Sequence, residues 1–173
     1  MYENIKNHIR NVPDFPKKGI LFKDITPALE NAEIFAEIIN AFYELLKDKK
    51  IDKIASIDAR GYLFGAPLAY KLGCGLVLVR KAGKLPAETL SETYDLEYGK
   101  AIIEVHKDAV NKGEKVLIVD DLLATGGTTK AACRLLQKLG ADIVANVFLI
   151  ELSDLGGRKV LEEFAPTISL LQY

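Results

Sequence analysis

The stretch VLIVDDLLATGGTT, residues 116–129, indicates both a fold class and a kind of ligand. Its apolar start is typical of a buried strand, which leads into Asp120 and Asp121 and then into a small-residue loop that opens a helix. Glycines let the backbone approach a phosphate closely, threonines add hydroxyl donors, and a helix start offers free N–H groups. The two carboxylates would repel phosphate but can accept hydrogen bonds from the vicinal hydroxyls of a ribose. The pattern therefore predicts a ribose 5-phosphate site, with a surface turn and an ordinary helix cap as the alternative.

Apolar strands and helices alternate along most of the chain. We expect strands at residues 53–58, 75–79, 116–119, 143–150 and 167–171, and helices at 33–48, 61–73 and 127–139. Continuous apolar strands separated by helices of about 12 residues predict an α/β fold with a parallel sheet covered on both faces. Ligands of such sheets bind beyond the carboxyl ends of the strands, so we expect the chemistry just after Asp58, Val79 and Val119.

Two segments depart from this alternation. Residues 1–31 hold three of the six prolines, which favours a small N-terminal hood packed on the sheet. Residues 81–100 are polar and interrupted by glycines and a proline, which favours a flexible lid that closes over a substrate. A hairpin using residues 89–96 and 101–105 is the plainer interpretation, and such a hairpin could also carry the lid. Because no linker or repeat separates the segments, we expect a single domain over the whole chain.

The composition excludes several classes of protein. The 173 residues include 23 Lys+Arg and 24 Asp+Glu, a formal net charge of −1, whereas a general nucleic-acid binder would carry a basic excess. The two cysteines lie in apolar stretches and do not make a disulfide framework, and the two histidines are not spaced with them as metal ligands. A reducing, cytoplasmic location is therefore expected. No apolar run approaches the roughly 18 residues of a membrane helix, so we expect no membrane partner.

Residues 116–129 resemble the signature of the type I phosphoribosyltransferases. The further motifs that carry this resemblance are FPKKGILFKDITP at 15–27, ARGYLFG at 59–65, RKAGKLP at 80–86, LEYGK at 96–100 and SLLQY at 169–173. Each motif is weak alone, but the ordered set covers essentially the whole chain and is similar to the members that act on adenine. The resemblance implies the type I phosphoribosyltransferase fold, a central, mostly parallel sheet flanked by helices, with the hood and a flexible hairpin lid.

The resemblance also implies an activity. These family members are pentosyltransferases of purine salvage, which join N9 of adenine to C1′ of 5-phosphoribosyl 1-pyrophosphate (PRPP) and give AMP and pyrophosphate with Mg²⁺. A homodimer is implied as well, in which Arg80 reaches the site of the neighbouring subunit. One rival interpretation is a hypoxanthine-guanine or xanthine enzyme. The other is a nucleotide sensor that binds nucleic acid, which would need an added DNA-binding segment or a broad basic face.

The residues matching the donor site fall into three groups. Asp120 and Asp121 would hold the ribose hydroxyls, directly or as ligands of Mg²⁺. The residues that would wrap the 5′-phosphate are Ala124, Thr125, Gly126, Gly127 and Thr128. The residues that would meet the pyrophosphate are Asp58, Ala59, Arg60, Arg80, Lys81 and Lys84. A cis peptide between Asp58 and Ala59 is implied too, whereas without the resemblance the basic run from Arg80 could be a solvated turn.

The residues matching the adenine site come from the hood and from the end of a strand. Phe22 would stack on the purine ring, with Leu152 packing opposite. Backbone groups of Leu21 and Lys23 would read the 6-amino edge of adenine, and hypoxanthine would reverse both hydrogen-bond polarities there. Ordinary core packing is the alternative for Phe22.

The residues implied in catalysis are Glu97, Arg60 and Tyr98. Glu97 would reach the imidazole edge of adenine as the lid shuts and accept the proton that leaves the base. Tyr98 would help to close the site. A solvated glutamate on a hairpin is the alternative for Glu97.

Overall fold

The computed structural model describes residues 2–95 and 99–173. The chain divides into two units, Met1–Leu45 and Leu46–Tyr173. The expected hood falls within the first unit, and the expected lid falls within the second. That both belong to one functional domain stays a prediction.

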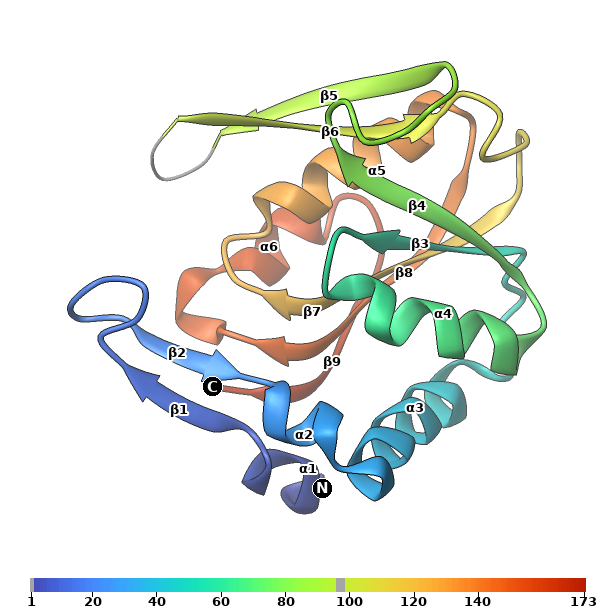
Figure 1. The fold of residues 1–173 in the computed structure, drawn as a ribbon. Helices are drawn as coiled ribbons and strands as arrows, with labels where there is room; N and C mark the ends of the chain where they lie inside the picture. Colours follow the sequence, from blue (N-terminus) through green and yellow to red (C-terminus); the bar gives the residue numbers. More distant parts are fainter. Residues whose placement is uncertain (1, 96–98) are drawn as a thin grey trace. The chain divides into compact units, whose positions relative to one another are not determined.

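In the described part of the second unit, seven strands form one sheet in the order β5-β6-β4-β3-β7-β8-β9 (Figure 1). The strands are β3 (Lys53–Ile57), β4 (Gly75–Lys81), β5 (Thr89–Asp95), β6 (Lys100–His106), β7 (Lys115–Leu123), β8 (Asp142–Glu151) and β9 (Thr167–Gln172). The five strands from β4 to β9 along this order pair in parallel, whereas β6 pairs antiparallel with β4 and β5. The expected α/β class with a mostly parallel sheet is confirmed.

Helices cover both faces of this sheet. They are α4 (Gly61–Leu72) after β3, α5 (Gly127–Lys138) after β7, and the short η1 (Ser153–Leu155) and α6 (Gly157–Leu161) after β8. Ser56 of β3 lies directly against Gly65 of α4, where a Cβ atom would be 1.6 Å from Ser56 Oγ. Its neighbours Ala55 and Ile57 belong instead to the buried cluster that contains Leu135 of α5. Since successive strand residues point to opposite faces, α4 and α5 lie on opposite sides of the sheet.

The order of the strands reverses between β3 and β7. From β3 the chain crosses to β4 on one side, whereas from β7 it moves away through β8 and β9 on the other side. Parallel α/β sheets bind their ligands beyond the carboxyl ends of the strands at such a reversal. The segments that follow β3 and β7, residues 58–60 and 124–126, therefore begin where a ligand is expected.

Strand β7 extends beyond residues 116–119. It pairs with β3 only as far as Val119 but continues beside β8 to Leu123. The expectation that Asp120 and Asp121 follow the strand is therefore wrong, because both lie inside β7. Beyond Val119, β7 is still paired with β8 but no longer with β3, so the two acids lie next to the end of β3.

Strands β5 and β6 form a hairpin at the edge of the sheet, with Asp95 opposite Lys100. The hairpin interpretation of this segment is confirmed, and its closing motion as a lid stays a prediction. Glu97 and Tyr98 lie outside the described residues.

The first unit contains a two-stranded antiparallel sheet that the sequence patterns did not predict. Its elements are α1 (Glu3–Asn7), β1 (Arg10–Pro13), β2 (Leu21–Asp24), α2 (Thr26–Glu30) and most of α3 (Ala32–Leu46). Val12 of β1 lies opposite Phe22 of β2. The expected helix α3 is confirmed, and the Asn31 side chain caps its start by accepting a hydrogen bond of 3.0 Å from the N–H of Glu33.

Candidate active site

Residues 124–126 form a tight loop between β7 and α5. The loop and the flanking residues line a hollow of about 90 Å³, which extends from Asp120 to Thr129. Gly126 has φ 82°, in the left-handed region that glycine adopts without a steric penalty. Helix α5 begins at the next residue, where unpaired N–H groups and the helix dipole favour an anion. The loop and helix start predicted from the sequence are confirmed, and their geometry suits a phosphate group.

In the acid pair of β7, Asp121 is buried and partly neutralised, and Asp120 is half-buried. The side chain of Asp121 is 6% exposed, and its Oδ2 lies 2.8 Å from Nε of Arg60. Asp120 Oδ1 accepts a hydrogen bond of 2.8 Å from the N–H of Asp121. Burial raises the pKa of Asp120, and the adjacent charge of Asp121 raises it further. Burial also raises the pKa of Asp121, while the Arg60 charge opposes that rise.

Arg60 follows a cis peptide between Asp58 and Ala59, as the family resemblance implies. The next residue, Gly61, begins α4 against the end of β7, where a Cβ atom would lie 2.8 Å from Val119 O. Because of this close approach, the segment after β3 and the acid pair in β7 form one site. The structure therefore brings Asp120 and Asp121, predicted to hold ribose, together with Arg60, one of the residues predicted to hold pyrophosphate.

Arg80 lies on the other side of β3, at the end of β4. Its Nε is 3.7 Å from Asp58 Oδ2, and one terminal nitrogen donates a hydrogen bond of 2.9 Å to Lys84 O. The buried Nε makes no hydrogen bond within the described residues. The guanidinium is thus held beside the segment after β3. The side chains of Lys81 and Lys84 are exposed.

The residues predicted to bind adenine are divided between the two units. In the first unit, Phe22 packs edge-to-face on Phe15, with ring centroids 5.1 Å apart. The two rings line a hollow of about 270 Å³ together with Val12 and Asp24. The sequence patterns did not single out Phe15 or Val12 as lining residues, because the hairpin that brings them to Phe22 was not predicted.

Leu21, Lys23 and Leu152 have different surroundings. Leu21 is 51% exposed, whereas Lys23 is half-buried and its Nζ donates a hydrogen bond of 2.7 Å to Asn11 Oδ1. Burial lowers the pKa of Lys23. Leu152, in the second unit, directly follows β8, and its N–H donates a hydrogen bond of 2.9 Å to Leu123 O. The predicted catalytic residues Glu97 and Tyr98 fall outside the described residues.

Gly157 was not predicted from the sequence as a site residue, yet its backbone lies directly against the loop of residues 124–126. A Cβ atom on Gly157 would lie 2.2 Å from Ala124 O and 3.1 Å from Gly126 N. Only a residue without a side chain fits there. The adjacent glycines at 156 and 157 were the signal that could have identified this approach.

Three further observations bear on the class of protein. Among the described residues, no three His, Cys, Asp or Glu side chains gather to hold a metal ion. Cys74 and Cys133 are free thiols. No helix within the described parts of the chain is both long and apolar enough to cross a membrane.

The phosphoribosyl transferase domain family matches residues 26–164 of this chain. An adenine phosphoribosyltransferase of Thermoanaerobacter sp. (strain X514) is 56% identical over 171 residues, which are 99% of this chain and 98% of the relative. The chain belongs to the adenine phosphoribosyltransferase family. A further adenine phosphoribosyltransferase, from Geobacter metallireducens, is 53% identical and covers 99% of both chains.

Solved adenine phosphoribosyltransferases share the fold. The crystal structure of the enzyme from Thermoanaerobacter pseudethanolicus matches with a TM-score of 0.96 at 55% identity and covers 100% of both chains. The enzyme from Saccharomyces cerevisiae, complexed with an imino-altritol bisphosphate and adenine, matches with a TM-score of 0.92 at 42% identity and covers 97% of both chains. The type I phosphoribosyltransferase fold expected from the sequence is confirmed.

Proposed function

We propose that this protein transfers the phosphoribosyl group of PRPP to N9 of adenine, giving AMP and pyrophosphate in purine salvage. One observation carries the proposal. Asp120 and the loop of residues 124–128 line one hollow, and Arg60 pairs with the adjacent Asp121, at the place where the strand order of the sheet reverses. Membership in the adenine phosphoribosyltransferase family and the adenine bound by the yeast relative support the choice of base.

The donor binds with its 5′-phosphate in the hollow lined by residues 124–128. Backbone N–H groups and the Thr125 and Thr128 hydroxyls donate to the phosphate oxygens. Asp120 and Asp121 accept hydrogen bonds from the ribose hydroxyls, and their negative charge stabilises the cationic ribosyl centre as the bond from C1′ to the pyrophosphate oxygen breaks. Positioning and charge stabilisation supply most of the rate enhancement in such a transfer.

The pyrophosphate lies beyond the carboxyl ends of β3 and β4. The residues 58–60 present backbone groups to it, and Arg60, Lys81 and Lys84 supply positive charge. Arg80 supplies positive charge to the pyrophosphate in the site of the partner subunit. The ion pair between Arg60 and Asp121 supports this arrangement, because the same guanidinium can face both the acids and a leaving anion. Arg80, held beside Asp58, is placed at the adjacent strand end.

Magnesium suits this acid pair. Mg²⁺ prefers oxygen ligands, keeps several waters and is bound through one or two carboxylates together with substrate phosphates. Asp120 and Asp121 are two such carboxylates, and burial and mutual repulsion disfavour their joint ionisation without a counter-charge. When bound, the ion neutralises charge on the pyrophosphate. Asp120 and Asp121 would hold it directly or through water.

Phe22 stacks on the adenine ring, and Leu152 is a second residue that contacts the base. The aromatic hollow of Phe15 and Phe22 supports stacking on the purine face. Strand β2 has one neighbour in its two-stranded sheet, so backbone groups of Leu21 and Lys23 on its other edge can read the 6-amino group and N1. As N9 attacks C1′ the base loses its N–H proton, which Glu97 accepts while Tyr98 helps the β5–β6 hairpin to close as a lid.

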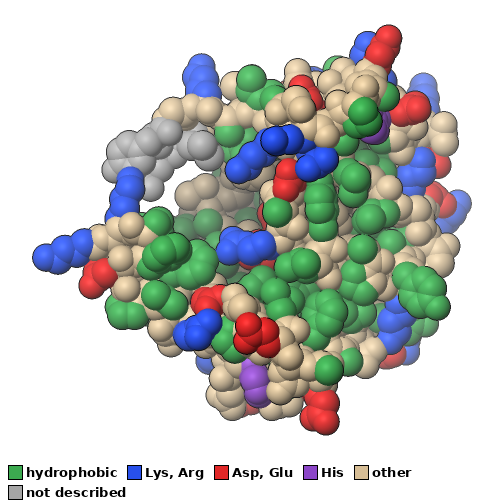
Figure 2. All heavy atoms as spheres, viewed as in Figure 1, with side chains coloured by type: hydrophobic (Ala, Val, Ile, Leu, Met, Phe, Trp, Pro, Cys, Tyr) green, Lys and Arg blue, Asp and Glu red, His purple; other side chains and the backbone are tan. Residues whose placement is uncertain are grey.

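The active protein is a homodimer, as an apolar surface on the second unit suggests. Figure 2 shows hydrophobic side chains gathered over α4 and β4. The exposed large hydrophobic residues of α4, β4 and the adjacent β6 are Leu63, Tyr70, Leu76, Leu78 and Ile102, each at least 39% exposed. Exposed apolar patches of this kind mark protein interfaces. Arg80 is the last residue but one of β4 and would reach the partner's site. The two free thiols agree with a cytoplasmic location.

One assay tests the base specificity. The protein is incubated with PRPP, Mg²⁺ and adenine, guanine, hypoxanthine or xanthine in turn, and nucleotide formation is followed by chromatography. We expect AMP from adenine and little product from the oxopurines. Turnover of an oxopurine but not of adenine would assign the protein to the rival enzymes, and PRPP binding without turnover of any base would favour the nucleotide sensor.

A further inference from the structure

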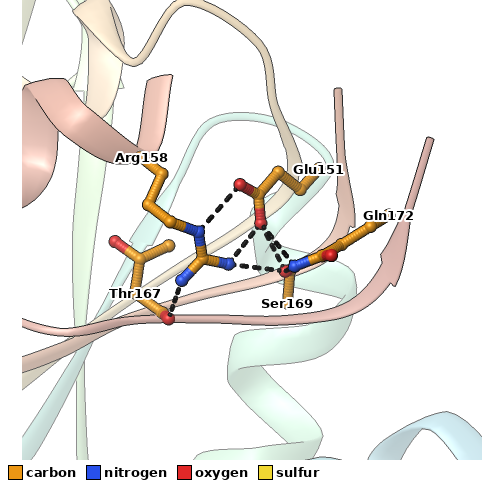
Figure 3. A network of polar contacts seen from close by, with 5 residues as sticks. All are labelled: Glu151, Arg158, Thr167, Ser169 and Gln172. Atoms are coloured by element: carbon orange, nitrogen blue, oxygen red, sulfur yellow. Dashed lines mark hydrogen bonds and ion pairs between the residues drawn. The ribbon is translucent and has the colours of Figure 1, made fainter. Parts of the chain in front are cut away.

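A buried carboxylate, that of Glu151, lies at the end of β8 and pairs with a residue of α6. Glu151 is 4% exposed, and Figure 3 shows four residues turned toward it or toward one another around it. Arg158 donates from Nε to Glu151 Oε1 at 2.9 Å and from a terminal nitrogen to Oε2. Ser169 Oγ donates to Oε2 at 2.5 Å, and Gln172 Nε2 lies 3.4 Å from the same oxygen. The carboxylate is thus paired on both oxygens.

The Arg158 guanidinium joins three elements of the second unit. It lies on α6, pairs with Glu151 on β8, and donates a hydrogen bond of 2.7 Å to Thr167 O on β9. A terminal nitrogen also donates to Ser169 Oγ at 3.1 Å. A planar guanidinium bound to both oxygens of a carboxylate fixes orientation as well as distance. The network therefore sets where α6 begins relative to the two strand ends.

The start of α6 lies directly against the loop predicted to bind phosphate. Gly157, next to Arg158, is in backbone contact with Ala124 and Gly126. Leu161 of α6 packs with Leu123 of β7 in a small buried cluster. A displacement of α6 would therefore move the backbone whose N–H groups face the donor phosphate.

We propose that Glu151 and Arg158 are positioning residues for the donor phosphate, acting through Gly157 on the loop of residues 124–126. The inference rests on the proposed role of that loop. Neither side chain touches substrate. Small displacements of a binding group cost large factors in binding, so loss of the network weakens the donor site while leaving the base site intact. The N–H of Leu152 donates a hydrogen bond to Leu123 O of β7, a contact that involves neither Glu151 nor Arg158.

The test measures PRPP binding by titration calorimetry and adenine saturation kinetics for Arg158→Met. We expect the dissociation constant for PRPP to rise about tenfold or more, with the KM for adenine changed less than about twofold. Lys159→Met is the matched control, because Lys159 is the next residue of α6 and is exposed. A role in stability alone would lower the fraction of protein that binds, and hence the stoichiometry, but not the dissociation constant of the folded molecules.

A second variant keeps the network and disturbs the contact. Gly157→Ala places a methyl group against Ala124 O and is expected to raise the PRPP dissociation constant, as Arg158→Met does. Because both changes act on the same loop, the dissociation constant of the double variant should be close to that of the weaker-binding single variant. If Arg158→Met does not fold, the PRPP dissociation constants of Gly157→Ala and of the milder Glu151→Gln test the inference instead. Wild-type affinity in the folded variants would overturn the inference. Failure of wild-type protein to bind PRPP would instead overturn the proposed function.

Discussion

Arg60 Nε lies 2.8 Å from Asp121 Oδ2, so a residue that follows β3 neutralises a buried acid inside β7. The two strands are neighbours, and the direction of the strand order changes between them. The ion pair therefore joins the two segments at the place where parallel α/β sheets bind ligands. Its position explains how two acids can stand beside a phosphate loop without a large net charge.

Removal of the Arg60 charge is expected to damage both stability and activity. Arg60→Met leaves Asp121 buried without its counter-charge, which costs about 1–3 kcal/mol of unfolding free energy. We also expect kcat/KM to fall by about 100-fold, because the same guanidinium is proposed to face the leaving pyrophosphate. Urea unfolding and initial rates measure the two effects. Lys107→Met is the control, since Lys107 pairs with Glu88 at an exposed site; equal losses in both variants would contradict the account.

Gly126 offers a test of the phosphate loop with a matched backbone control. Gly126 and Gly113 have φ of 82° and 84°, but of the two only Gly126 has atoms within 4 Å of the place an alanine methyl group would take, with Gly157 O at 3.0 Å. Alanine at either position costs about 1 kcal/mol of backbone strain. We expect only Gly126→Ala to weaken PRPP binding, measured by calorimetry. Equal PRPP affinity in the two variants would show that this loop does not hold the donor.

The Glu151 network predicts a pH dependence of stability. Hydrogen bonds from Arg158, followed by that from Ser169, hold the pKa of Glu151 below its usual value. The folded state therefore binds the proton less well than the unfolded state, and the network stabilises the fold above the unfolded pKa of about 4.3. As pH falls through the folded pKa this contribution is lost. Urea unfolding from pH 6 to pH 3 should show the gap between wild type and Glu151→Gln narrowing with acid; a constant gap would contradict the charge pairing.

The proposed dimer predicts complementation between inactive variants. Leu78→Asp places a charge on the apolar surface over α4 and β4 and should yield monomers by sedimentation, whereas Leu155→Asp, at a 50% exposed leucine outside that surface, should not. If Arg80 acts in the partner's site, a refolded mixture of Arg80→Met and Asp121→Asn chains should recover about a quarter of wild-type activity, because half of the dimers regain one intact site. Absence of recovery would restrict Arg80 to its own subunit.

The regular part of the fold follows from local patterns. Strands such as residues 53–57 and 143–150 are mostly apolar runs, and the helix after Gly126 starts at a glycine pair, so their existence could be predicted from short windows. The prediction that the pair of acids holds a ligand rests on the same kind of local pattern, since the adjoining loop carries its own chemical signal.

The parts that could not be predicted depend on residues distant in the sequence. Asp120 and Asp121 lie within β7 because β8 continues beside it after β3 has ended, which no local window reveals. The Phe15–Phe22 contact needs a hairpin whose strands are only four residues long. The support of the loop by Gly157 depends on α6 packing, and the glycine pair alone did not indicate its partner.

The central claim is that the acid pair in β7 and the loop after it hold PRPP for transfer to adenine. The most direct test compares wild-type protein with the double variant Asp120→Asn, Asp121→Asn in a reaction with PRPP, Mg²⁺ and adenine, followed by ³¹P NMR. Asparagine and aspartate side chains have nearly equal volumes, so the double variant should keep the fold. Its circular dichroism spectrum, compared with that of the wild type, checks this. The account predicts AMP and pyrophosphate in equal amounts from the wild type and none from the folded double variant. Near-normal formation of AMP by that variant would contradict it.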